Sequence, residues 1–227
     1  MSGLFLSRAA LRRDAHVDAL AGLLVPSNPA DRVGASHKLV WALFADTADR
    51  RRDFLWREER PGHFMALSNR PPQDPHGLFE LDSKPFEPVL SIGDRLGFTL
   101  RANPVVARMV TKSQRGRRHD IVMDALHAVP PGERAAVRLQ TIVTAGRAWL
   151  NRQGEAHGFA PCGEAAVDGY DRVRIPRAGG EPAVFGMLDI SGVLEIRDPA
   201  RFTARLAVGF GRARAFGCGL MLIRRVR

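Results

Sequence analysis

Cysteine is nearly absent from this sequence, with only Cys162 and Cys218 among 227 residues. The two cysteines are far apart, there is no CxxC pair, and no histidine lies at the spacing of a zinc ligand. A disulfide framework and a structural zinc site are therefore excluded as organising features. We interpret both cysteines as small, reduced, partly buried thiols.

Long apolar runs are also missing. The longest, Leu20 to Val25, is far below the roughly 20 residues that a membrane-spanning helix needs. The N-terminal run Leu4 to Leu6 is too short for the core of a signal peptide, and arginines soon follow it. We expect a cytoplasmic protein with no membrane partner.

Lysine is scarce, occurring only at positions 38, 84 and 112, so that arginine supplies 31 of the 34 basic residues. Against 24 acidic residues the formal net charge is +10, which favours a polyanionic partner such as nucleic acid. The planar arginine fork suits bidentate contacts with phosphates and bases. Biased codon usage in the genome would produce the same excess of arginine, and composition leaves both explanations open.

The first half of the chain predicts strands and one main helix. Apolar periodicity predicts a strand over 3–11, a short helical stretch over 17–24, and a helix over 32–45 with Asp31 as its N-cap. His37 falls at the edge of the apolar stripe of that helix, and Lys38 points away from it. Strands are predicted over 53–57, 63–68 and 94–102, with a proline-rich loop over 71–88.

The second half predicts a helix over 131–150, a hairpin that joins 173–175 to 183–196, a helix opened by Asp198 and Pro199, and a strand over 220–223. Each half thus approaches the order strand, helix, strand, strand, helix, strand. We predict an α+β fold of tandem ferredoxin-like (RRM-like) domains with antiparallel sheets, spanning 1–105 and 106–227. The second half fits this order better than the first.

A glycine-rich segment lies between the last predicted helix and the last strand, with glycines at Gly209, Gly211, Gly217 and Gly219. P-loops and dinucleotide fingerprints run in the order strand, loop, helix, so a nucleotide cofactor is disfavoured and no cofactor is expected. Glycines allow backbone amides to approach a phosphate chain closely. A plain tight connection would explain the segment equally well.

The segment G-F-G-R-A-R-A-F-G-C-G-L, at 209–220, resembles the C-terminal glycine-rich loop of the repeat-associated RNA-binding superfamily, which supplies CRISPR processing enzymes. Three further segments resemble the CasE type of CRISPR endoribonuclease and occur in the same order. They are the strand at 4–8, the block 98–104 with its sequence R-A-N-P, and the segment 185–195. The resemblance covers nearly the whole chain.

The resemblance implies a metal-independent endoribonuclease that cuts precursor CRISPR RNA on the 3′ side of a repeat hairpin. The ribose 2′-hydroxyl attacks the adjacent phosphate and leaves a 2′,3′-cyclic phosphate, and no metal is required. The resemblance also implies that the protein stays bound to the crRNA beside the other subunits of the Cascade surveillance complex.

His37 stands at the position of the family's helical histidine, and imidazole can act as acid or base near neutral pH. The family commonly has a tyrosine three residues earlier, where this chain has Gly34. Ser36, Lys38 and Lys112 are the candidates for the group that replaces it.

Basic side chains are the predicted RNA contacts. By resemblance, Arg172, Arg174 and Arg177 lie on a hairpin that enters the major groove at the base of the RNA stem, which requires a widened groove. The predicted backbone contacts, which set affinity more than sequence choice, are Arg101, Lys112, Arg115, Arg117, Arg118, Arg212 and Arg214. A solvated basic loop and an exposed basic hairpin are the alternatives.

Two other functions compete with the endoribonuclease. A non-catalytic, RNA-hairpin-binding structural subunit is suggested by Gly34 in place of tyrosine. A basic DNA-binding regulator is disfavoured, because the sequence has no clear helix-turn-helix and its few aromatic residues show no stacking pattern.

Overall fold

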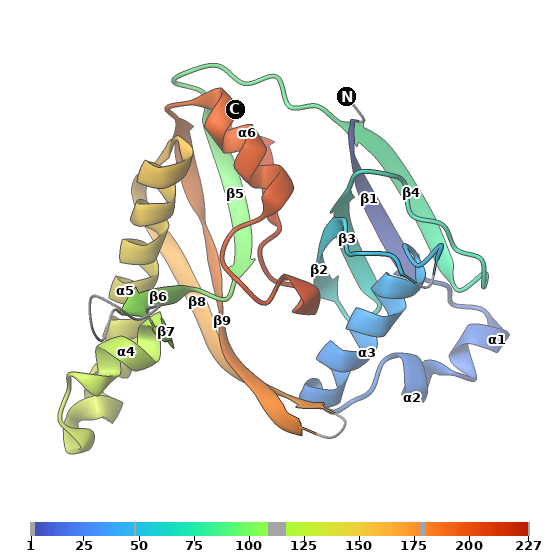
Figure 1. Cartoon of the computed structure of the whole chain (residues 1–227), viewed down its shortest axis with the longest axis horizontal. Coiled ribbons are helices and arrows are strands. Elements are labelled where there is room, and N and C mark those ends of the chain that lie inside the picture. Colours follow the sequence, from blue (N-terminus) through green and yellow to red (C-terminus); the bar gives the residue numbers. More distant parts are fainter. Residues whose placement is uncertain (1–2, 48, 109–116, 178–179, 227) are drawn as a thin grey trace.

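The computed structural model describes residues 3–226 apart from 48, 109–116 and 178–179, and the side chains of 29, 30, 117 and 177 lie outside the description. Two lobes stand side by side, each built on a four-stranded antiparallel sheet (Figure 1). The predicted α+β class, with tandem ferredoxin-like domains, is confirmed.

The N-terminal lobe has the sheet order β2-β3-β1-β4, in which β1 pairs antiparallel with β3 and β4. Its elements are β1 (Leu4–Leu11), α1 (Ala15–Asp18), α2 (Ala21–Leu24), α3 (Pro29–Ala42), β2 (Phe54–Arg60), β3 (His63–Ser68) and β4 (Phe79–Phe86). This is the ferredoxin-like order without its second helix, because the connection 69–78 between β3 and β4 is not helical. The apolar stripe of α3 packs on the sheet in a buried cluster that contains Val40, Phe44, Trp56 and Phe64.

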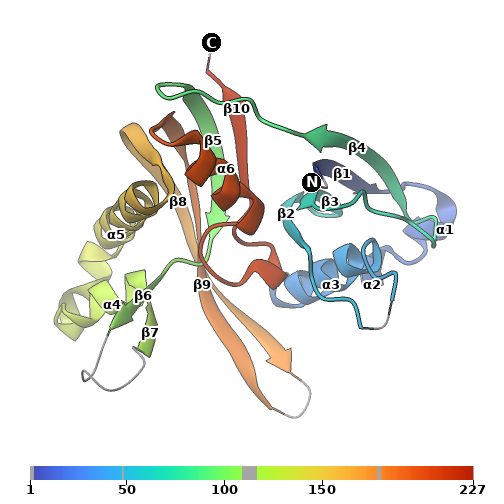
Figure 2. The same ribbon diagram turned by 45° about the horizontal axis from the view of Figure 1, so that its top comes forward.

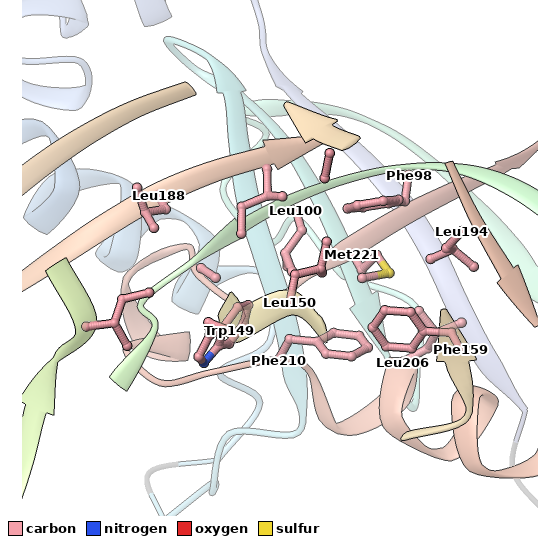
Figure 3. Close-up of a cluster of buried hydrophobic side chains, with 14 of the residues drawn as sticks. Phe98, Leu100, Trp149, Leu150, Phe159, Leu188, Leu194, Leu206, Phe210 and Met221 are labelled. Atoms are coloured by element: carbon pink, nitrogen blue, oxygen red, sulfur yellow. The ribbon is translucent and has the colours of Figure 1, made fainter. Parts of the chain in front are cut away.

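The C-terminal lobe repeats the fold with both helices present. Its elements are β5 (Arg95–Ala102), β6 (Val105–Arg108), β7 (Arg117–Asp120), α4 (Ile121–His127), η1 (Pro131–Glu133), α5 (Arg134–His157), β8 (Phe159–Arg177), β9 (Gly180–Ile196), α6 (Pro199–Val208), η2 (Arg214–Phe216) and β10 (Met221–Arg225). The sheet order is β10-β5-β9-β8. Beneath it Phe159, Leu206 and Phe210 pack together in the main core (Figure 3).

The two lobes meet through the edge strand β10, which lies beside β5 (Figure 2). Leu220 packs there against Leu55 and Leu67 of the first sheet. Because β5 already belongs to the second sheet, the change from one sheet to the other falls between Phe86 and Arg95, earlier than residue 105.

Several predicted boundaries are wrong. The helix α3 begins at Pro29, which fits the first helical position, so Asp31 lies in the first turn instead of capping the helix. The proline-rich loop contains the strand β4, and the segment between β7 and α5 contains the short helix α4. The hairpin of β8 and β9 is much longer than predicted and extends toward α3 (Figure 1).

The end of the chain agrees with its prediction. Asp198 caps α6, accepting a hydrogen bond from the Arg201 backbone amide at 3.0 Å.

Both cysteines are free, and burial raises the pKa of the Cys218 thiol to about 12.

Candidate functional site

The candidate site lies where α3 of the N-terminal lobe meets the glycine-rich loop of the C-terminal lobe. The loop leaves α6 and turns toward α3 before it enters β10 (Figure 1, Figure 2). There the ring centroid of His37 lies 5.4 Å from that of Phe216 and 6.2 Å from that of Trp41. Phe216 in turn stacks on Phe185 of β9 at 5.5 Å. Aromatic side chains from both lobes therefore hold the His37 ring.

Two hollows share His37 and Lys38 as lining residues. One, of about 780 Å³, runs between α2, α3 and the β8 residue Ile175, and we call it the groove. The other, of about 450 Å³, lies toward the loop that carries His76. The His37 and Lys38 pair is thus open to a ligand from two directions.

The surroundings of His37 favour its neutral form. Burial lowers the pKa of His37 below its usual value; the backbone of Ala215 opposes this shift, and the charges of Arg52 and Lys38 add to it. The Ala215 carbonyl already accepts a hydrogen bond from Trp56 Nε1 at 3.2 Å. Nδ1 of His37 is buried and makes no well-aligned hydrogen bond to any group in the described part of the chain. A neutral imidazole can accept a proton near neutral pH.

The neighbours of His37 on the helix differ in their access to the groove. Lys38 is exposed beside it. Ser36 is only 2% exposed and donates a hydrogen bond to Glu58 Oε2 at 3.1 Å. Ser36 therefore faces the sheet, and its hydroxyl serves the packing of α3 on β2.

The glycines of the loop are required by its backbone. Gly209, Gly211, Gly217 and Gly219 all have positive φ values, between 72° and 93°. A Cβ atom on Gly211 would stand 2.7 Å from the Asn103 carbonyl oxygen, and one on Gly209 would stand 2.8 Å from Leu55 of the other lobe. The predicted loop therefore docks its backbone against the protein itself and so places Phe216 beside His37.

Arg101 is engaged within the protein. Its guanidinium donates two hydrogen bonds of 2.9 Å to the Asp189 carboxylate and a third, of 3.3 Å, to the Glu58 carbonyl in the N-terminal lobe. Asn103, in the same R-A-N-P block, donates to the Gly186 carbonyl at 2.7 Å. Arg101 therefore joins the two lobes, and its role as an RNA contact stays a prediction.

The remaining predicted RNA contacts are spread over the C-terminal lobe. Lys112 and Arg115 lie outside the described residues, as do the side chains of Arg117 and Arg177. Arg118 of β7 and Arg212 of the loop are exposed, and Arg214 is half-buried. Arg172 and Arg174 are exposed on β8, where they alternate with the buried Val173 and Ile175. One face of the hairpin is thus basic while the other packs inward.

Sequence reasoning missed Phe216 and Arg52, although each acts directly on the surroundings of His37. Phe216 lies far from His37 in the sequence, and Arg52 lies in the irregular segment between α3 and β2, so no local pattern marks either residue. Among the described residues, no group of three or more metal-ligating side chains is gathered in one place. None of the helices in that part of the chain is long and apolar enough to cross a membrane.

These features define the class as a two-lobed α+β protein of tandem ferredoxin-like domains, with a histidine in the groove between the lobes and a basic hairpin beside it. The family model described as "CRISPR associated protein" matches residues 4–225. The chain belongs to this family.

Two relatives from the sequence comparison are similar over much of the chain. The CRISPR-associated endoribonuclease Cse3 of Thermus thermophilus is 30% identical over 150 residues, which cover 62% of this chain and 60% of the relative. The Cascade subunit CasE of Escherichia coli is 25% identical over 190 residues, which cover 82% of this chain and 88% of the relative.

Solved structures support the fold. The structure of Thermus thermophilus Cse3 bound to an RNA that represents a pre-cleavage complex has a TM-score of 0.67 and 24% identity, with 98% of this chain and 99% of that chain covered. Cas6e from Escherichia coli has a TM-score of 0.55 and 20% identity, with 98% and 100% covered.

Proposed function

We propose that this chain is an endoribonuclease that cleaves precursor CRISPR RNA on the 3′ side of a repeat hairpin. The observation that carries the proposal is His37, held with a lowered pKa in a groove between the two ferredoxin-like lobes. The names of the relatives, an endoribonuclease and a Cascade subunit, support it. By the same similarity the protein stays bound to its crRNA product, beside the other Cascade subunits in the cytoplasm.

The reaction needs two proton transfers and no metal. The ribose 2′-hydroxyl loses its proton as its oxygen bonds to the adjacent phosphorus. The bond from phosphorus to the 5′-oxygen then breaks, and that oxygen gains a proton. The products carry a 2′,3′-cyclic phosphate and a 5′-hydroxyl. The neutral imidazole of His37 suits the first transfer, because it can take a proton near neutral pH.

Lys38 suits the stabilisation of negative charge on the phosphate, because its ammonium group is exposed beside His37 and lines both hollows. Ser36 is committed to Glu58 and has no part in this scheme. Gly34 also lines the groove, and a Cβ atom there would meet nothing within 4 Å. The groove therefore has room for a substrate group where relatives of this type commonly carry tyrosine.

The test is cleavage of a labelled repeat RNA in excess EDTA by the wild type and by the His37→Ala variant. His127→Ala is the control, because His127 is exposed on α4 of the C-terminal lobe and lines neither hollow. We expect one cut by the wild type and the control, with a cyclic phosphate end, and a loss of at least about 100-fold in rate for His37→Ala. Equal rates for all three proteins would remove His37 from the chemistry.

A non-catalytic, RNA-hairpin-binding subunit is the second candidate, favoured by the glycine at position 34. It predicts tight binding of the repeat RNA with no cut at any pH. In that case the Gly34→Tyr variant, whose Cβ atom would meet nothing within 4 Å, should gain cleavage.

A further inference from the structure

Three arginines from separate parts of the chain gather at the glycine-rich loop. Arg52 lies just before β2, Arg205 lies on α6, and Arg214 opens the turn η2. The strand after Arg52 is tied to the turn after Arg214 by the hydrogen bond from Trp56 Nε1 to the Ala215 carbonyl, 3.2 Å long.

Arg205 lies on α6 just before the loop, Arg214 lies within the loop, and the charge of Arg214 acts on Arg205. The Arg205 guanidinium carbon lies 5.4 Å from the centre of the Phe210 ring. A Cβ atom on Gly219 would stand 2.8 Å from the Phe210 carbonyl oxygen and 3.2 Å from Arg214 Cγ. Gly219 therefore lets the aliphatic stem of Arg214 lie close to Phe210, whose ring the Arg205 guanidinium covers.

These arginines lack the acceptors that their burial requires. Nη1 of Arg52 and Nε of Arg205 are buried without a hydrogen-bond partner among the described residues. Within the described residues, the Arg214 guanidinium donates a single hydrogen bond, to the Gly211 carbonyl at 3.2 Å. Burial lowers the pKa of Arg52 and of Arg205, and the positive charge of Arg214 lowers both further. The charge of Arg214 thus repels both Arg52 and Arg205 in a partly desolvated place.

Two other half-buried arginines are neutralised by carboxylates. Arg101 pairs with Asp189 at 2.9 Å, and Arg70 pairs with Asp53 at 3.1 Å. No carboxylate is paired with Arg52, Arg205 or Arg214 in the part of the chain that the structure describes. A buried cation without a counter-charge is costly, and a bound anion would offset that cost.

The cluster continues directly from the groove of His37. Phe216, whose ring lies 5.4 Å from that of His37, follows Arg214 by two residues. The β8–β9 hairpin borders the groove through Ile175. If the β8–β9 hairpin holds an RNA stem, the single-stranded RNA that leaves the stem and passes His37 would next reach the arginines.

We propose that Arg52, Arg205 and Arg214 form a phosphate site for the single-stranded RNA backbone on the 3′ side of the cleavage point. Guanidinium groups bind phosphate oxygens in bidentate pairs, and such contacts add affinity without sequence choice. This inference rests on the proposed function for the direction of the strand.

The test measures binding, so that it does not depend on cleavage. Two RNAs carry a 2′-deoxy nucleotide at the cleavage point, and one of them ends there while the other continues with a single-stranded 3′ flank. The cluster variant is Arg52→Gln with Arg205→Gln. The control is Arg51→Gln with Arg201→Gln, two exposed arginines next to Arg52 and one turn before Arg205. Denaturation curves establish that both variants are folded.

We expect the cluster variant to bind the flanked RNA about 10-fold more weakly than the control, with the salt dependence of log K reduced by about 1. Both variants should bind the unflanked RNA alike. If the double variant does not fold, Arg205→Gln and Arg201→Gln alone carry the same comparison.

Equal binding of the flanked RNA by the cluster and control variants would overturn the proposal, whether or not the wild type cleaves. It would also be overturned if inorganic phosphate stabilised the wild type through these arginines while the flank added no affinity, because the site would then take free phosphate. A flank effect that depends on the cluster, in a wild type that never cuts, would support the site while refuting the nuclease function.

Discussion

The Gly211→Ala substitution tests whether the glycine-rich loop is a docked element of the protein. Gly211 has a φ of +72°, and a Cβ atom there would stand 2.7 Å from the Asn103 carbonyl oxygen. That oxygen also accepts a hydrogen bond from the Arg212 backbone amide at 3.1 Å. A left-handed backbone costs about 1 kcal/mol for alanine, and the displaced hydrogen bond costs about 1 kcal/mol more. With the strain of the close contact, we expect a loss of about 2 to 4 kcal/mol in the free energy of unfolding.

The assay is denaturant unfolding, with Gly34→Ala as the matched control. Gly34 lies inside α3, and its added Cβ atom would meet nothing within 4 Å, so alanine there should stabilise the protein by about 0.5 to 1 kcal/mol. The Gly211→Ala variant should also cleave more slowly, because a shifted loop moves Phe216 away from His37. If the two alanine variants had equal stability, the reasoning about the loop would be refuted.

Three further predictions concern individual side chains. The pKa of His37 is lowered from the usual histidine value of 6.5, and only its neutral form accepts a proton. The single-turnover rate should therefore fall with decreasing pH only below pH 6.5. A rate that keeps rising above pH 8 would contradict this role. Arg101→Met should lose about 1 to 2 kcal/mol of stability, since the bonds of Arg101 to Asp189 and Glu58 are partly exposed. The variant should bind the RNA hairpin as the wild type does. A large loss of affinity would show that Arg101 contacts the RNA. Ser36→Ala should lose about 1 kcal/mol in denaturation and keep its cleavage rate, and a rate loss of 100-fold would show that its bond to Glu58 does not exclude it from the chemistry.

The parts of the fold that follow a local pattern were predictable. The strand predicted over 63–68 coincides with β3, and the Asp198-Pro199 start of α6 follows from capping chemistry alone. The strand β4 gave no signal, because it is an edge strand whose middle residues are all exposed and which contains Pro85. The helix α4 has only seven residues, too few for a clear period.

The candidate site was predictable only in part. His37 came from resemblance, since one histidine on a helix has no chemical signature of its own. Phe216 approaches His37, and Arg214 approaches Arg52, only because the loop packs against the N-terminal lobe. Their spacing in the sequence therefore does not predict these contacts. The bonds of Arg101 to Asp189 and Glu58 were not predictable either, because these partners lie on other strands.

The central claim is that His37 serves an attack by the RNA's own 2′-hydroxyl, and one pair of substrates tests it most directly. The repeat RNA and the same RNA with a single 2′-deoxy nucleotide at the cleavage point are each incubated with the wild-type protein in excess EDTA. We predict equal binding of both RNAs, one cut in the all-ribose RNA that leaves a 2′,3′-cyclic phosphate end, and no cut in the deoxy RNA. Cleavage of the deoxy RNA, or tight binding of both with no cut in either, would contradict this claim.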